Sequence, residues 1–189
     1  IRKAELITDK FGLTKDSYIL FLGRLVPEKG IRYLVEAFKN VKTEKKLVIA
    51  GGSSDTDSFM KELKELAKDD KRIIFTGFVQ GQMLEELYSN AYIYTLPSDL
   101  EGMPLSLLEA MSYGNCCLVS DIQECTEVVE DKALIFKKSN VQDLQNKLQE
   151  ACDRTEKVME LKQQAADYIC KKYNWDDVVE ETLKLYRRK

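Results

Sequence analysis

The chain has 189 residues, of which 44% are hydrophobic and 32% are charged, and its net charge at pH 7 is −3. This apolar share is enough for a packed core and excludes a disordered chain, and the length fits one compact domain. The slightly acidic balance argues against a nucleic-acid partner, because nucleic-acid binders are usually strongly basic. Charged residues interrupt every apolar run, so we expect no membrane-spanning helix.

The sequence contains five cysteines and no histidine. The cysteines form no C-x-x-C pair, which argues against a zinc site or a disulfide framework and favours reduced thiols in a cytosol. Cys116 and Cys117 lie in an apolar run, and we expect them to pack in the core. Histidine is the commonest general base and metal ligand, so a catalytic histidine would have to come from another part of the protein.

Short apolar runs recur along the chain and are typical of buried strands in a parallel sheet. They cover residues 18–22, 47–50, 73–75, 91–96, 116–119 and 133–136. The segments between them have helical spacing, and apolar residues mark one face at Ile31, Leu34, Val35 and Phe38. Alternating strands and helices predict right-handed βαβ units with helices on both faces of the sheet. The predicted fold is therefore α/β: a Rossmann-like, doubly wound parallel sheet of about six strands, followed by a helical C-terminal tail.

Ligands of such sheets bind beyond the carboxyl ends of the strands, so the loops at those ends are the candidate site. After the first strand, Gly23 and Gly30 flank a loop that contains Arg24 and Lys29, and a helix is predicted directly after it. Arg24 can bind phosphate in a bidentate manner, and Lys29 can act as a point charge. Two ordinary surface cations on a solvated loop are the simpler alternative. The sequence has no P-loop and no G-x-G-x-x-G motif, which disfavours dinucleotide redox chemistry.

The segment 101–109 follows the fourth strand and reads Glu-Gly-Met-Pro-Leu-Ser-Leu-Leu-Glu. Pro104 fits the first helical position, so we expect the helix to start there and to offer free amides at Gly102, Met103, Leu105 and Ser106. Glu109 lies among apolar residues, and a helix of this kind should be buried. A buried carboxylate needs partners, which the two vicinal hydroxyls of a ribose would provide. Pairing with a buried Arg or Lys, or a place on a narrow exposed stripe, are the alternatives.

The chain resembles the donor-binding half of a GT-B glycosyltransferase in four strings that occur in the expected order. These are GRLVPEKG (23–30), VIAGG (48–52), FTGFV (75–79) and LPSDLEGMPLSLLEAMSYG (96–114). More narrowly, they are similar to family 4 of retaining, nucleotide-sugar-dependent enzymes, the glycosyl transferases group 1. The hallmark of that family is a pair of glutamates separated by seven residues, here Glu101 and Glu109.

The resemblance implies a role for each matching residue. Arg24 and Lys29 would bind the donor diphosphate and stabilise the charge that grows as the sugar–phosphate bond breaks. With Glu101, which would bind sugar hydroxyls near the reacting carbon, they are the expected catalytic residues. Glu109 would hold the ribose hydroxyls. The remaining donor-binding residues would be Gly23 in the first loop, Phe78 and Val79 as a wall for the nucleobase, and Gly102, Met103, Pro104 and Leu105 around the sugar and phosphate.

The resemblance also implies the reaction and its partners. The full enzyme would transfer a hexose, with retention, from a nucleoside diphosphate sugar to a saccharide or lipid-linked acceptor, and we expect a UDP-linked donor. No metal or other cofactor is expected. A cytoplasmic location follows, with attachment to the inner face of the membrane only through a part outside this chain. A non-catalytic module that senses a nucleotide sugar, or another GT-B enzyme such as an epimerase, is the alternative.

The same resemblance suggests how the chain is divided. We expect residues 1–17 to be the end of an interdomain linker, 18–172 to be the nucleotide-sugar-binding domain, and 173–189 to be a helix that crosses to a missing N-terminal acceptor domain. The isolated piece should then transfer no sugar. An Asp-x-Asp motif at 55–57 matches the metal signature of the other main glycosyltransferase fold, but such carboxylates are ordinary before a helix, so we expect no metal there.

Overall fold

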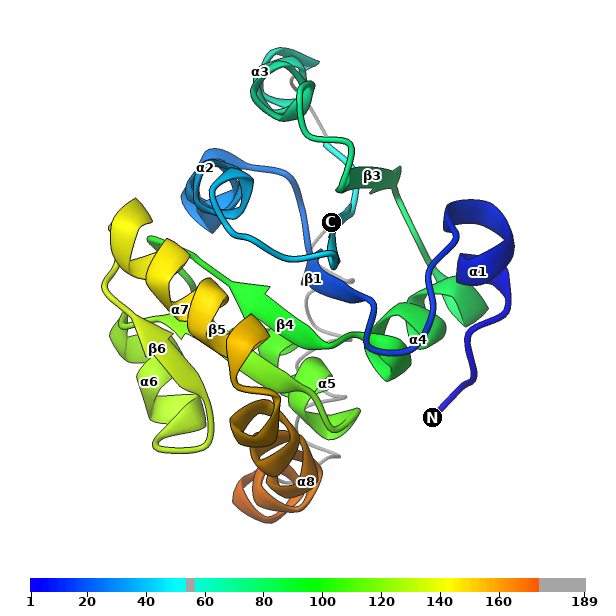
Figure 1. Cartoon of the computed structure of the whole chain (residues 1–189). Coiled ribbons are helices and arrows are strands. Elements are labelled where there is room, and N and C mark those ends of the chain that lie inside the picture. The colour runs from blue at the N-terminus through cyan, green and yellow to red at the C-terminus, as the bar shows by residue number, and fades with distance from the viewer. Residues whose placement is uncertain (54–56, 174–189) are drawn as a thin grey trace, which may run out of the picture.

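The computed structural model describes residues 1–53 and 57–173 of the chain. Six parallel strands form one sheet in the order β3-β2-β1-β4-β5-β6 (Figure 1). They are β1 (Tyr18–Leu22), β2 (Lys46–Ala50), β3 (Ile73–Gly77), β4 (Ile93–Leu96), β5 (Cys116–Ser120) and β6 (Leu134–Phe136). All six predicted strands are confirmed, and their bounds differ from the prediction by at most two residues.

Helices cover both faces of this sheet. They are α1 (Leu6–Phe11), the 3₁₀ turn η1 (Pro27–Lys29), α2 (Ile31–Lys39), α3 (Asp57–Ala67), α4 (Gly81–Asn90), α5 (Leu105–Ser112), α6 (Gln123–Val129), α7 (Val141–Asp153) and α8 (Thr155–Lys172). On one face α2 packs against α3 and α7, and on the other α5 packs against α8 (Figure 1). The Rossmann-like, doubly wound α/β fold with a helical C-terminal part is therefore confirmed.

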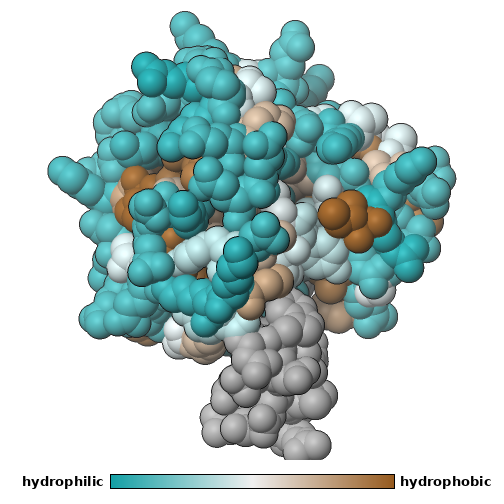
Figure 2. Space-filling view, turned by 90° about the horizontal axis from the view of Figure 1, so that it is seen from below, coloured by the Kyte–Doolittle hydropathy of each residue, from teal (hydrophilic) through white to brown (hydrophobic). Residues whose placement is uncertain are grey.

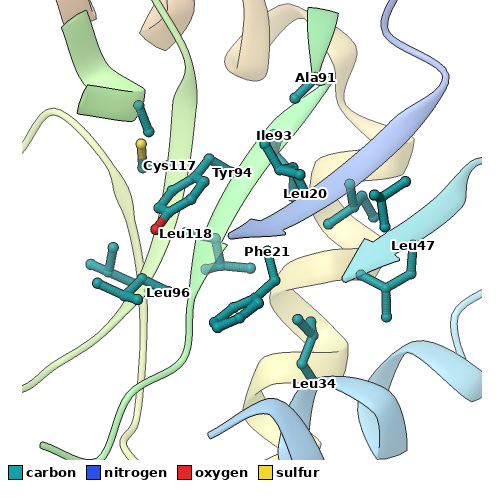
Figure 3. Packing of buried hydrophobic residues seen from close by; sticks show 14 of the residues in the cluster. Leu20, Phe21, Leu34, Leu47, Ala91, Ile93, Tyr94, Leu96, Cys117 and Leu118 are labelled. Carbon is teal, nitrogen blue, oxygen red and sulfur yellow. The ribbon is translucent and has the colours of Figure 1, made fainter. Parts of the chain in front are cut away.

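The core lies between the sheet and these two helical layers. The predicted apolar face of α2 is buried at all four positions, and Figure 3 shows side chains from β1, β2, β4, β5 and α2 gathered in this core. Cys116 and Cys117 of β5 are fully buried, as expected. Burial raises the pKa of the Cys116 thiol to about 12, so this thiol stays protonated and serves as a packing group.

Residues 1–17, predicted to end a linker, include the helix α1, which packs against α4. The carboxylate of Glu86, which is fully buried on α4, accepts hydrogen bonds from the backbone N–H groups of Glu5 (2.8 Å) and Ile7 (3.2 Å). Burial by itself would raise the pKa of Glu86, but these bonds and one from Gln82 together hold it below its usual value. Glu86 thus supplies the N-terminal cap that α1 lacks in its own side chains.

Two sequence predictions fall largely outside the described residues: the crossover helix predicted for 173–189, of which only Tyr173, the C-cap of α8, is described, and the first two positions of the Asp-x-Asp motif. In the described part of the chain, no helix combines the length and the apolar character that a bilayer crossing requires. Figure 2 shows a mostly hydrophilic face with small, separate hydrophobic patches.

Candidate functional site

The candidate site lies where β1 and β4 meet in the middle of the sheet, because the chain leaves these two strands toward opposite faces. Two glycines let the loops at this edge approach closely. A Cβ at Gly30 would lie 1.9 Å from the carbonyl oxygen of Pro97, and one at Gly51 would lie 1.8 Å from that of Gly23. Both glycines also have positive φ angles, +73° and +136°. The loops after β1, β2 and β4 are therefore packed backbone to backbone.

Lys29 and Glu101 form an ion pair across these loops. The Lys29 Nζ lies 2.7 Å from Oε2 and 3.0 Å from Oε1 of the carboxylate. The side chain of Glu101 is only 5% exposed and that of Lys29 is 21% exposed, so solvent screens the pair weakly. The structure brings together two predicted site residues that are 72 positions apart in the sequence.

Serine hydroxyls complete the surroundings of Glu101. Ser98 donates a hydrogen bond from Oγ to Oε2 of Glu101 at 2.6 Å, and the Oγ of Ser120, at the end of β5, donates to the Ser98 carbonyl at 2.5 Å. A carboxylate has about four lone-pair positions, of which Lys29 and Ser98 occupy three. Glu101 can thus accept one further hydrogen bond, for instance from a sugar hydroxyl, without losing its present partners.

The start of α5 differs from the prediction by one residue. The helix begins at Leu105 and not at Pro104, whose carbonyl oxygen accepts the N–H groups of Leu107 and Leu108 at 3.0 and 3.2 Å. Pro104 is therefore the N-cap. The Leu105 amide, expected to be free, donates to the Met103 carbonyl at 2.9 Å because the chain turns tightly before the helix. Gly102 and Met103 are exposed at this turn.

Glu109 lies on α5 between buried neighbours but is itself half-buried. Burial raises the pKa of its carboxyl group, and the influence of the neighbouring Tyr88 hydroxyl opposes that rise. Within residues 1–53 and 57–173, no Lys or Arg forms an ion pair with Glu109. The alternative of a buried cationic partner is thus not found in the described part of the molecule.

The remaining predicted residues lie along the same edge of the sheet. Arg24 is exposed in the loop after β1, and the next residue, Leu25, donates its N–H to the Gly52 carbonyl at 3.1 Å. Gly52 in turn lies against Phe78, since a Cβ at Gly52 would be 3.7 Å from the Phe78 Cβ. Phe78 is 74% exposed after β3, whereas Val79 is half-buried. A continuous edge thus runs from the cationic loop to an exposed aromatic ring.

Sequence reasoning missed the ion pair between Lys29 and Glu101 and the two serines behind it. No spacing rule connects residues in different loops, and Ser98 and Ser120 are unremarkable in the sequence. The rule for the ends of parallel strands brings these residues to one edge, but it does not say which of them contact one another.

The sequence pattern of the glycosyl transferases group 1 family matches residues 4–168 of the chain. Among curated relatives, the O-antigen chain mannosyltransferase B of Escherichia coli is 27% identical over 96% of this chain and 48% of its own length. The N,N'-diacetylbacillosaminyl-diphospho-undecaprenol alpha-1,3-N-acetylgalactosaminyltransferase of Campylobacter jejuni is 28% identical over 98% of this chain and 48% of its own. The chain thus spans about half the length of the curated relatives it matches.

A solved structure with the same fold is that of HepE from Anabaena in complex with UDP-glucose. It matches with a TM-score of 0.83 and 17% identity, over 97% of this chain and 52% of the HepE chain. Since the family pattern covers most of the described residues, including both glutamates of the Glu101–Glu109 pair, the chain belongs to the glycosyl transferases group 1 family.

Proposed function

We propose that this chain is the donor-binding part of a retaining glycosyltransferase that moves a hexose from a UDP-linked sugar to a saccharide or lipid-linked acceptor. Membership of the family supports a transferase. The UDP-glucose bound to HepE supports a nucleotide-sugar donor, and the name of the Campylobacter jejuni relative supports a lipid-linked acceptor. The cytosolic side of a membrane, where such acceptors would be met, is the proposed location.

The proposal rests mainly on the surroundings of Glu109. It is half-buried, its pKa is raised by burial, and in the described residues no cation pairs with it. Burial partly desolvates this carboxylate and no cation compensates it in the described residues, so a ligand that supplies hydrogen-bond donors would be favoured here. The 2′ and 3′ hydroxyls of a ribose are two adjacent donors that fit its two oxygens, which supports a nucleotide as the ligand.

The Lys29–Glu101 pair would do the chemical work. The Lys29 Nζ is hydrogen-bonded to both oxygens of the Glu101 carboxylate. The Lys29 charge is therefore already fixed in position and needs little rearrangement to contact a diphosphate. Arg24 is exposed in the same loop and can add bidentate bonds to phosphate. Charge on the leaving diphosphate increases as the sugar–phosphate bond breaks, so both cations would stabilise the transition state more than the bound donor. We propose that these side chains take the place of a metal.

Transfer needs an acceptor site as well, and the longer relatives have twice the length of this chain. We propose that acceptor binding and transfer depend on a further domain of that kind. The chain described here should therefore bind a nucleotide without transferring sugar.

A thermal-shift panel of UDP, GDP, ADP and CDP, each with and without EDTA, tests the proposal. A ligand at about 100 times its Kd adds roughly 2.7 kcal/mol, or about 5–10 °C for a domain of this size. We expect a shift with UDP that EDTA does not change. A shift that EDTA abolishes would contradict the metal-free site, and no shift with any nucleotide would contradict nucleotide binding by this chain.

Arg24→Ala tests the phosphate site in the same assay. It should weaken UDP more than uridine, because only UDP carries the diphosphate that Arg24 would contact. Equal losses of affinity for UDP and uridine would mean that Arg24 does not contact the phosphates.

A further inference from the structure

Asp99 connects three strand ends of the candidate edge. Its side chain accepts a hydrogen bond from the Tyr33 hydroxyl of α2 on Oδ2 and one from the Ser139 hydroxyl on Oδ1, both at 2.6 Å. Its backbone N–H donates to the Glu28 carbonyl at 2.9 Å. Tyr33 and Glu28 belong to the segment after β1, and Ser139 belongs to the loop between β6 and α7. Asp99 therefore joins the segments after β1, β4 and β6.

Both partners of the Asp99 side chain, Tyr33 and Ser139, have properties that favour hydrogen bonds to a carboxylate. Ser139 has a φ of +60°, which is unfavourable for a residue other than glycine, so its hydroxyl is held toward Asp99 at some cost in backbone energy. The hydrogen bond to Asp99 raises the pKa of the Tyr33 hydroxyl, so this hydroxyl remains a donor at neutral pH. Two hydroxyl donors need an acceptor with two oxygens, which is what a carboxylate offers.

These contacts lie directly beside the Lys29–Glu101 pair. Glu28, whose carbonyl accepts the Asp99 N–H, precedes Lys29, and Asp99 lies two residues before Glu101. One hydrogen bond therefore joins the two backbone segments that carry the ion pair. The side-chain bonds to Tyr33 and Ser139 hold Asp99 in place.

We propose that Asp99 is a positioning residue: it holds the backbones of Lys29 and Glu101 at the separation that presents the Lys29 charge to the donor diphosphate. Asp99 itself contacts no ligand in this arrangement. The inference rests on the proposed function in so far as the diphosphate is the ligand, but the tether between the two segments is independent of it.

Hydrogen exchange of the chain without ligand tests the tether. In Asp99→Ala the N–H of residue 99 can still bond to the Glu28 carbonyl, but Tyr33 and Ser139 no longer fix residue 99, so peptides covering 26–30 and 98–104 should exchange about tenfold faster. The matched control is Asp121→Ala. Asp121 is an exposed loop aspartate at the same edge, and its Oδ1 accepts the Lys138 N–H at 2.9 Å without reaching the Lys29 segment. Unchanged exchange at 26–30 in Asp99→Ala would overturn the proposal.

Nucleotide affinity separates positioning from general loosening. Asp99→Ala should weaken UDP about tenfold and UMP less than twofold, because only UDP carries the second phosphate. Asp99→Asn should restore UDP affinity to within about threefold, since its amide can accept from Tyr33 and donate to the Ser139 oxygen. Equal losses for UDP and UMP, or failure of the asparagine variant to restore UDP, would overturn the positioning role.

Hydrogen exchange tests the tether and nucleotide affinity tests the proposed function, so either claim can be wrong without the other. If the unsubstituted chain binds neither UDP nor UMP, the proposed function is wrong, whereas faster exchange at 26–30 and 98–104 in Asp99→Ala would still establish the tether. If UDP binds and exchange at 26–30 does not change, nucleotide binding stands and the role of Asp99 is wrong.

Discussion

Glu101 and Glu109, the two glutamates that seven residues separate in the family motif, have different surroundings. The Glu101 side chain is 5% exposed, yet Lys29 and Ser98 satisfy its oxygens. Glu109 is half-buried and has no ion pair with any cation of residues 1–53 and 57–173. The Glu101 carboxylate is thus bonded within the protein, whereas Glu109 is partly open to solvent and could accept hydrogen bonds from a ligand.

In the proposed function, this contrast gives the two glutamates of one sequence motif different tasks. A satisfied carboxylate fixes the position of a cation before the ligand arrives, which lowers the cost of binding. An unsatisfied carboxylate is unfavourable without ligand and gains most when donors arrive. Substitutions at the two sites should therefore act on different quantities, the stability of the chain and its affinity for nucleotide.

The largest effect on stability is expected from Lys29→Ala. The variant leaves the Glu101 carboxylate nearly buried and without its cation, which costs about 3 kcal/mol or roughly 6–12 °C in Tm. Urea unfolding measures the loss. Lys68→Ala is the matched control and should change little, because the ion pair of Lys68 with Glu65 is exposed.

A second variant sharpens the interpretation of the first. Lys29→Ala combined with Glu101→Ala removes the uncompensated charge, so the double variant should be more stable than Lys29→Ala alone. Additive losses would mean that the two side chains do not stabilise each other.

Glu109→Ala should instead act on affinity. We expect the affinity for UDP to fall by about 1.5–3 kcal/mol, because hydrogen bonds to a charged group are lost. Affinity for a UDP analogue without the 2′ and 3′ hydroxyls should not change, and calorimetric titration of both ligands measures the difference. The exposed Glu150 of α7 provides the control, Glu150→Ala. An equal loss for both ligands would contradict the contact with ribose.

The pH dependence of stability should distinguish Glu109 from Glu86, whose pKa values are shifted in opposite directions from 4.5. The raised pKa of Glu109 means that the folded state binds more protons than the unfolded state, so the stability contribution of Glu109 falls as pH rises above about 4.5. The lowered pKa of Glu86 stabilises the fold above that pH, and this contribution is lost as pH falls through the folded pKa.

Urea unfolding between pH 3 and pH 8 without nucleotide tests these signs. Relative to the unsubstituted chain, Glu109→Gln should become more stable as pH rises, and Glu86→Gln should become less stable. Both differences should become independent of pH at low pH, where all the carboxyl groups are protonated. The same sign for both variants would contradict the contrast between an unsatisfied and a satisfied carboxylate.

The smallest effect is expected at Phe78. Its ring is 74% exposed, so Phe78→Ala should change the free energy of unfolding by less than about 0.5 kcal/mol. If the ring contacts the nucleobase, the affinities for uridine and UDP should both fall by about 1 kcal/mol. A loss for UDP alone would place Phe78 near the phosphates.

The fold could be predicted because its signals are local. The continuous apolar runs mark buried strands, and the spacing of Ile31, Leu34 and Phe38 marks the buried face of a helix. Each of these patterns can be read within one short segment of the sequence. The positions of the site loops followed from the rule for strand ends. The pairing of Lys29 with Glu101 could not be predicted, because it depends on how two loops pack. The start of α5 was misplaced by one residue because Pro104 fits both the first helical position and the cap.

The close backbone contacts at Gly30 and Gly51 have a consequence for how such a site changes over generations. A single methyl group at either position would act as a wedge and force the loops of the ligand edge apart. The shape of this edge therefore depends on two residues that have no side chain. The exposed side chains of Phe78 and Met103 lie outside this backbone contact, so substitutions there should leave the packing of the loops unchanged.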